Sequence, residues 1–177
     1  MNVAESVDNK SDASNYVALC IFRAFCETTN PGDGRVFAPY IYELSNIADA
    51  RVAKCFKSKN WQDVDLSMIA THHPTQLSFE GAIYFLPAVL MATLDKSAEG
   101  DDWNFLNEYI YDDFRGLTPE YNRNKINLKE HLTPAQKFAV VAYLKFRSGK
   151  DDAALPSLEG TWSDVDYSDN NSSTILG

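Results

Sequence analysis

Sulfur and imidazole side chains are scarce in this sequence, which holds three cysteines and three histidines among 177 residues. Cys20, Cys26 and Cys55 form an odd set without paired spacings, which predicts free thiols in a reducing compartment, not a disulfide framework. His72 and His73 are adjacent, and neighbouring imidazoles in an extended loop point to opposite sides, so that one metal ion rarely binds both. We therefore expect no metal site.

Motifs for cofactors and catalysis are also missing. The turn PGDGR at 31–35 lacks the preceding strand and the lysine of a phosphate-binding loop, and the chain has no Gly-x-Ser-x-Gly nucleophile turn. Cys55 has lysines beside it, which makes it the best candidate for a reactive thiol, but it has no neighbouring base. We expect no cofactor, and the sequence favours a non-enzymatic protein. The alternative is a metal-assisted hydrolase that uses carboxylates and His72 or His73, brought together by the fold.

Long apolar runs and basic charge are in short supply. The run AIYFLPAVLMATL at 82–94 is shorter than the ~20 residues that span a bilayer, and the first residues are acidic and polar, unlike a signal peptide. The net charge is −9. Because basic residues supply most of the affinity for nucleic acids and for anionic membranes, we expect neither as a partner. A cytoplasmic location follows as the expectation.

What the sequence does contain is material for an aromatic-rich core. Hydrophobic residues make up 45% of it, with ten Phe, nine Tyr and three Trp, as is typical of a globular domain. We predict an all-α fold, a compact bundle of about six helices. The expected organisation is a polar leader at 1–13, a single helical domain at 14–149, and an acidic tail at 150–177. Because Trp162 and Tyr167 interrupt this tail, we expect it to be partly draped on the domain.

The first predicted helix follows Ser14. Apolar residues recur at helical spacing along its inner side, at Val17, Ile21, Ala24 and Phe25. Leu19, Phe22 and Cys26 are expected to widen this buried stripe. Cys20 and Cys26 should then be buried and inert, as free cysteines usually are.

The run at 82–94 is the expected central helix of the core. Ser78 is placed to cap its first turn, and Glu80 is placed to interact with the positive end of the helix dipole. Pro87 predicts one helix kinked at that residue or two abutting helices. Since the run is apolar nearly all round, we expect it to be buried on every side.

Shorter signals surround these two helices. The segment 48–57 is expected as a helix with Cys55 and Phe56 inward, followed by a short turn at Trp61 that Asn60 caps. The stretch TPAQ predicts a capping box between Thr133 and Gln136, and the helix that it opens is expected to end at Gly149.

Four segments form a more specific pattern: FRAF (22–25), FKSKNW (56–61), YFLPAVLM (84–91) and LTPAQKFAVVAYL (132–144). In this order they resemble a family of small bacterial proteins catalogued only as a domain of unknown function. The resemblance covers about residues 15–148, although Val89 stands where family members often have a tyrosine. It implies a helical fold and brings no activity with it. Small acidic bacterial proteins of this class are frequently immunity or antitoxin proteins.

An acidic helix is the best candidate for a binding surface. Asp101, Glu108 and Asp112 are spaced to share one helix face, and Asp102 and Asp113 extend it. Asp112 and Asp113 fall in the last turn, where the helix dipole disfavours negative charge. These five residues are the predicted partner-binding surface of a protein that neutralises a basic partner, in the manner of an immunity protein. A merely solvated face is one alternative, and a structural oligomer subunit is another.

Overall fold

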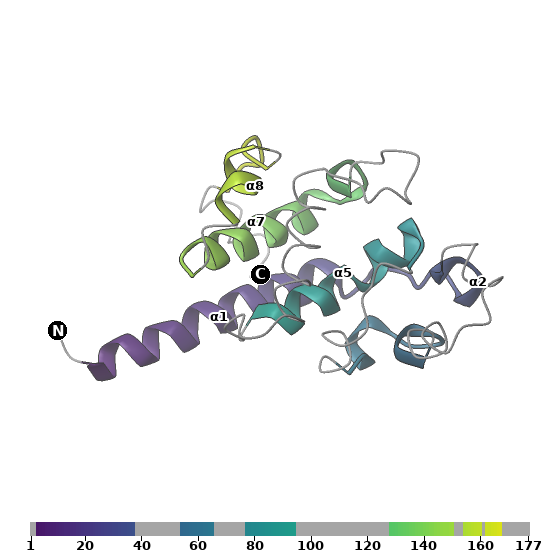
Figure 1. The fold of residues 1–177 in the computed structure, drawn as a ribbon, viewed down its shortest axis with the longest axis horizontal. Coiled ribbons are helices and arrows are strands. Elements are labelled where there is room, and N and C mark those ends of the chain that lie inside the picture. Colours follow the sequence, from purple (N-terminus) through teal and green to yellow (C-terminus); the bar gives the residue numbers. More distant parts are fainter. Residues whose placement is uncertain are drawn as a thin grey trace. The chain divides into compact units, whose positions relative to one another are not determined.

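The computed structural model describes residues 3–37, 54–65, 77–94, 128–150, 154–160 and 162–167. Its helices are α1 (Val3–Phe25), α2 (Asp33–Val36), α5 (Phe79–Leu94), α7 (Pro134–Ser148) and α8 (Leu155–Glu159), and the short 3-10 turns η2 (Trp61–Asp63) and η4 (Leu128–His131) accompany them (Figure 1). Within these ranges, the β-type pairing is confined to an isolated bridge between Phe37 and Leu77. The predicted all-α fold class is confirmed. The expected count of about six helices stays a prediction.

The chain divides into two compact units. The first unit joins residues 1–26 to 109–177, and the second comprises residues 27–108. The first therefore contains α1, η4, α7 and α8, and the second contains α2, η2 and α5. The sequence-based division into leader, single domain and tail stays a prediction.

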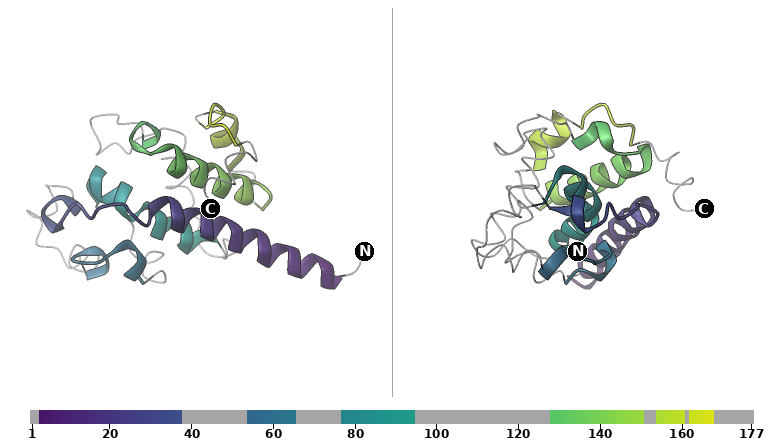
Figure 2. Two further views of the ribbon diagram at one scale, coloured as in Figure 1. Left: turned by 180° about the vertical axis from the view of Figure 1, so that it is seen from behind. Right: turned by 90° about the vertical axis from the view of Figure 1, so that its right-hand side faces the viewer.

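In the first unit, α1 and α7 lie side by side, although more than a hundred residues separate them in the sequence (Figure 2). The start of α1 at Val3 places most of the expected polar leader within a helix, because polarity argues against burial and not against helix formation. The face of α1 that is buried consists of Val17, Cys20, Ile21 and Phe25. The two helices thus bury one another's apolar sides, which is the main source of stability for helices in proteins.

The other side of α1 corrects the sequence analysis. Leu19 is 40% exposed and Phe22 is 47% exposed, and Cys26 is exposed as well. A helix turns by about 100° per residue, which carries Phe22 about 100° and Leu19 about 160° away from Ile21, and Cys26 follows the last helical residue. The prediction that Leu19, Phe22 and Cys26 widen the buried stripe was therefore wrong, because their position around the helix axis, and not their apolar character, decides which side they face.

Helix α7 matches its sequence signals. The Thr133 hydroxyl accepts the Gln136 backbone N–H, the Gln136 side chain accepts the Thr133 N–H, and Gly149 follows the last residue of the helix. The predicted capping box and helix end are confirmed. Every residue from Phe138 to Leu144 is buried, because α7 contacts α1 and also α8.

In the second unit, α5 is the buried helix that its composition predicts. The Gly81 N–H donates to the Ser78 hydroxyl over 2.9 Å, so the predicted cap is confirmed. All residues between Tyr84 and Leu90 are buried, and Pro87 lies inside the helix. A kink at Pro87 stays a prediction. None of the helices in the described parts of the chain is long and apolar enough to span a membrane.

Candidate functional site

Most of the residues that the sequence analysis singled out for function lie outside the described residues. Asp101, Asp102, Glu108, Asp112 and Asp113 lie outside the described residues, and so do both adjacent histidines. The acidic helix face therefore stays a prediction. Among the residues that the structure does describe, no group of three or more His, Cys, Asp or Glu side chains is placed to hold a metal ion.

The three cysteines are free thiols, as predicted. Burial raises the pKa of the Cys20 and Cys55 thiols above the ordinary value, so both stay protonated and unreactive near neutral pH. This removes Cys55 as the candidate reactive thiol, because desolvation outweighs the lysines beside it. Cys26, expected to be buried, is exposed and its Sγ donates to the Arg23 carbonyl over 3.3 Å.

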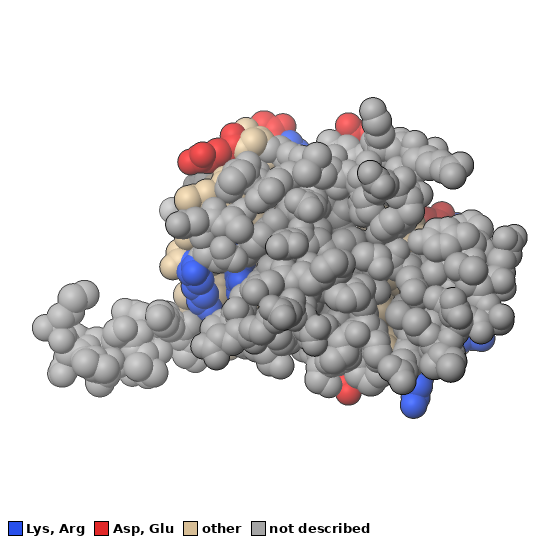
Figure 3. All heavy atoms as spheres, in the orientation of Figure 1, with Lys and Arg blue, Asp and Glu red and all other residues tan. Residues whose placement is uncertain are grey.

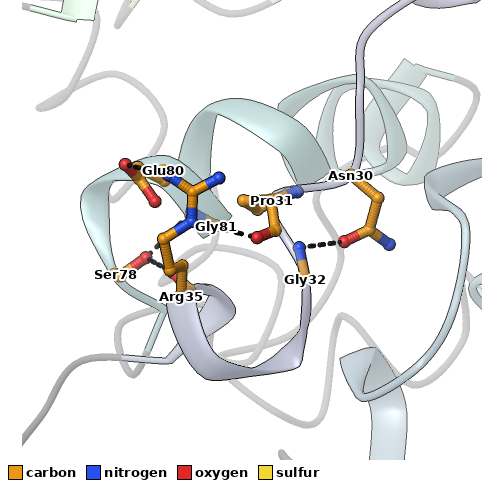
Figure 4. A network of polar contacts seen from close by, with 7 residues as sticks. All are labelled: Asn30, Pro31, Gly32, Arg35, Ser78, Glu80 and Gly81. Carbon is orange, nitrogen blue, oxygen red and sulfur yellow. Dashed lines mark hydrogen bonds and ion pairs between the residues drawn. The ribbon is translucent and has the colours of Figure 1, made fainter.

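Two polar clusters remain as candidates, one in each unit. The first, which we call the joint, connects residues 30–36 to the start of α5 (Figure 4). The Ser78 hydroxyl donates to the Arg35 carbonyl, and the Ser78 N–H donates to the Val36 carbonyl over 2.8 Å. The Arg35 guanidinium lies 3.3 Å from the Glu80 carboxylate, with both side chains well exposed. Gly81 completes the joint, because a Cβ there would collide with the Val36 backbone carbonyl.

The joint also reaches the segment before η2. The Asp33 carboxylate accepts the Ser58 N–H over 2.6 Å and the Ser58 hydroxyl over 2.5 Å. These two donors, the hydroxyl first, lower the pKa of Asp33 below its ordinary value. Ser58 has a φ of 55°, a left-handed conformation that is costly for a residue with a Cβ. The Asn30 amide adds a bond to the Lys59 carbonyl over 3.0 Å. Most bonds of the joint involve backbone groups, so they hold its three segments together.

The second cluster lies in the first unit and involves residues 162–167, which we call the strap. The Trp162 side chain is 1% exposed and anchors one end of the strap in the core. Two residues on, Asp164 forms an ion pair with Lys129 of η4. The Asp164 side chain is 73% exposed, whereas that of Lys129 is 15% exposed. The hydrogen bond from Lys129 is the main reason that the pKa of Asp164 lies below its ordinary value.

The far end of the strap lies on α7. The Tyr167 ring stacks on Phe138, with centroids 4.7 Å apart and planes 13° from parallel. The Lys145 Nζ lies 3.7 Å from the centroid of the same Tyr167 ring, which is within the range of a cation–π contact. Trp162 and Tyr167, the aromatic interruptions seen in the sequence, thus form the two ends of the strap. No sequence signal pointed to Lys129 as the partner of Asp164 or to Lys145 as the partner of Tyr167.

Charge is unevenly placed on this part of the surface. Figure 3 shows acidic side chains gathered over α8 and the strap. Glu159, Asp164 and Asp166 are exposed there. The arrangement presents carboxylates outward on a segment whose tryptophan is buried, and such a surface favours contact with cations.

Comparisons with known protein families, with curated proteins and with solved structures found no match. The function is therefore inferred from the residues and their contacts. Of the two clusters, the strap is the one that lies where exposed acidic side chains gather, and we take it as the candidate functional site.

Proposed function

We propose that this protein is a non-enzymatic, cytoplasmic protein-binding domain that takes a basic protein partner, in the manner of an immunity or antitoxin protein. The observation that supports this most directly is the strap. Its anchor, Trp162, is 1% exposed while the Asp164 side chain is 73% exposed, so carboxylates are held in place at the surface. A net charge of −9 adds long-range attraction for a basic protein.

The acidic helix face predicted from the sequence is a second part of the proposal. Asp101, Asp102, Glu108, Asp112 and Asp113 would add carboxylates to those of the strap, and complementary charge would speed association with a basic partner. The immunity-type role is proposed from the class of small acidic bacterial proteins, since the resemblance to a family of unknown function brings no activity with it.

The test is affinity capture from the protein's own cells at low salt, with identification by mass spectrometry. One variant carries Glu159→Lys, Asp164→Lys and Asp166→Lys, and a second carries Asp101→Lys, Glu108→Lys and Asp112→Lys. A charge-matched control carries Glu27→Lys, Asp63→Lys and Asp65→Lys in the second unit. We expect the wild type and the control to recover the same basic protein, and the first two variants to lose it. Equal recovery by all four proteins would contradict both surfaces.

The outer face of α1 favours a second candidate function, an oligomer-forming subunit. Leu19 and Phe22 are 40% and 47% exposed and lie on one side of the helix with Cys26, and exposed apolar side chains that cluster are characteristic of interfaces. Sedimentation of the wild type, Phe22→Asp and the control Ala13→Asp tests it. A dimer that Phe22→Asp alone dissociates supports this candidate, whereas a monomeric wild type rejects it.

The hydrolase alternative depends on His72 or His73, and no observation on the described residues favours it. The protonated thiols of Cys20 and Cys55 offer it no nucleophile. A large rise in melting temperature on adding divalent metal ions would revive it, because a ligand that binds the folded state stabilises that state.

A further inference from the structure

The strap is held by two different kinds of contact. At its inner end, Trp162 is 1% exposed, and Ala154, which precedes α8, is fully buried. At its outer end, the Lys129 ammonium meets Asp164 and the Lys145 ammonium lies over the Tyr167 ring, which also stacks on Phe138. A buried tryptophan is among the largest contributions that one side chain makes to a core. A cation–π contact at the surface and an ion pair whose carboxylate is 73% exposed are weaker.

The outer contacts match what a basic partner would offer. A lysine-rich surface presents ammonium groups, which pair with carboxylates and bind over aromatic faces. Asp164 and Tyr167 already receive one ammonium each from the chain itself. Lys129 and Lys145 thus stand where the cations of a basic partner would have to be.

We propose that Lys129 and Lys145 form an autoinhibitory contact, in which the chain's own lysines occupy Asp164 and Tyr167 until a basic partner displaces them. This inference rests on the proposed function of the strap as an acidic binding surface. In this inference, a basic partner binds by replacing the ammonium groups of Lys129 and Lys145. The stronger these internal contacts are, the lower is the affinity for the partner.

The anchor makes such an exchange feasible. Trp162 holds the strap two residues before Asp164, and the Val165 N–H donates to the Trp162 carbonyl over 3.2 Å, which fixes the turn between them. The carboxylate can therefore change its partner without unfolding the segment. Phe138 beneath Tyr167 is 3% exposed, so the stacked pair offers a preformed aromatic face to an incoming cation.

The experiment compares two double variants of equal net charge. Lys129→Met with Lys145→Met removes both internal cations and keeps the apolar stems, which matters because the Lys129 side chain is only 15% exposed. The control, Lys54→Met with Lys57→Met, removes two exposed lysines of the second unit. The probe is a decalysine peptide, and its affinity is measured by calorimetry at low salt for the wild type and both variants.

We expect the first double variant to bind decalysine on the order of tenfold more tightly than the control, because each internal contact that it removes competes several-fold. Amide exchange at residues 163–167 should also be faster in that variant than in the control. Equal affinities of the two double variants would overturn the inference and leave the proposed function standing. No binding of decalysine by the wild type or either variant would reject both.

Discussion

The two polar clusters each hold a segment of the chain in place, but they do so with different kinds of contact. The joint of the second unit fastens three segments with short groups near the backbone, such as the Ser78 hydroxyl on the Arg35 carbonyl and the Asp33 carboxylate on the Ser58 N–H. Beyond Trp162, the strap of the first unit is held by the ammonium groups of two lysines and by the stacking of Tyr167 on Phe138. Backbone atoms in contact cannot yield without moving whole segments, whereas a lysine ammonium can change its partner by rotation of a flexible side chain. The joint is therefore suited to fixing a fold, and the outer strap to changing partners.

The largest effect is expected at the anchor of the strap. Trp162→Ala should lower the free energy of unfolding by about 3–5 kcal/mol, because a fully buried tryptophan leaves a large cavity. Tyr167→Ala should cost much less, since Tyr167 is partly exposed. Urea denaturation of both variants measures the difference. Equal losses would contradict the division of the strap into an anchored end and an exchangeable end.

Gly81 tests the rigidity of the joint. Gly81→Ala should destabilise the protein by about 1–3 kcal/mol, because the added methyl group meets the Val36 carbonyl and forces backbone to move. Gly34→Ala is the matched control, since a Cβ at that position meets nothing within 4 Å. The control should be neutral or slightly stabilising, because alanine restricts the unfolded chain. A Gly81→Ala variant as stable as the control would show that the joint can relax.

Ser58 separates strain from hydrogen bonding within the joint. Both Ser58→Gly and Ser58→Ala remove the hydroxyl that Asp33 accepts, but only glycine suits a φ of 55°. The glycine variant should therefore be more stable than the alanine variant by about 1 kcal/mol. Thermal unfolding of the pair gives the comparison, and an alanine variant of equal stability would mean that the backbone has turned away from this conformation.

The smallest effects are expected from acid and salt. The pKa values of Asp33 and Asp164 are both lowered in the folded protein, by the bonds from Ser58 and Lys129 respectively. Their contributions are thus complete above the unfolded pKa of about 4 and are lost as the pH falls through the lower folded values. Asp33→Asn and Asp164→Asn should each lose less stability than the wild type between pH 5 and pH 2, by chemical denaturation.

Salt distinguishes these two carboxylates. Raising the salt concentration to roughly 1 M should weaken the Lys129–Asp164 ion pair by screening, because the Asp164 side chain is 73% exposed. The Asp33 bonds to Ser58 involve a neutral donor, so the contribution of Asp33 should change little. If salt lowered the stabilising contributions of Asp33 and Asp164 equally, the joint and the strap would not differ in their electrostatics.

The sequence was most informative where a signal is local. The caps at Ser78 and Thr133 could be predicted because a capping residue and its partner lie within one helical turn. The cap expected at Asn60 was wrong, because its side chain makes no capping bond to η2. Long-range contacts carry no such pattern: nothing in the sequence links Gly81 to Val36, or Lys129 to Asp164. On α1, the outward position of Phe22 could have been predicted from its angle on the helix. For Phe22, helical periodicity predicts the exposed position correctly, whereas its apolar side chain favours the wrong prediction of burial.

The end of α1 has a practical consequence. Of the three thiols, Cys20 and Cys55 are buried, and Cys26 is exposed. A maleimide dye or spin label added to the folded wild type should thus attach at one position without any engineered cysteine. Cys26 is thus a natural attachment point for spectroscopic labels, and it is the last residue of the 1–26 segment of the first unit.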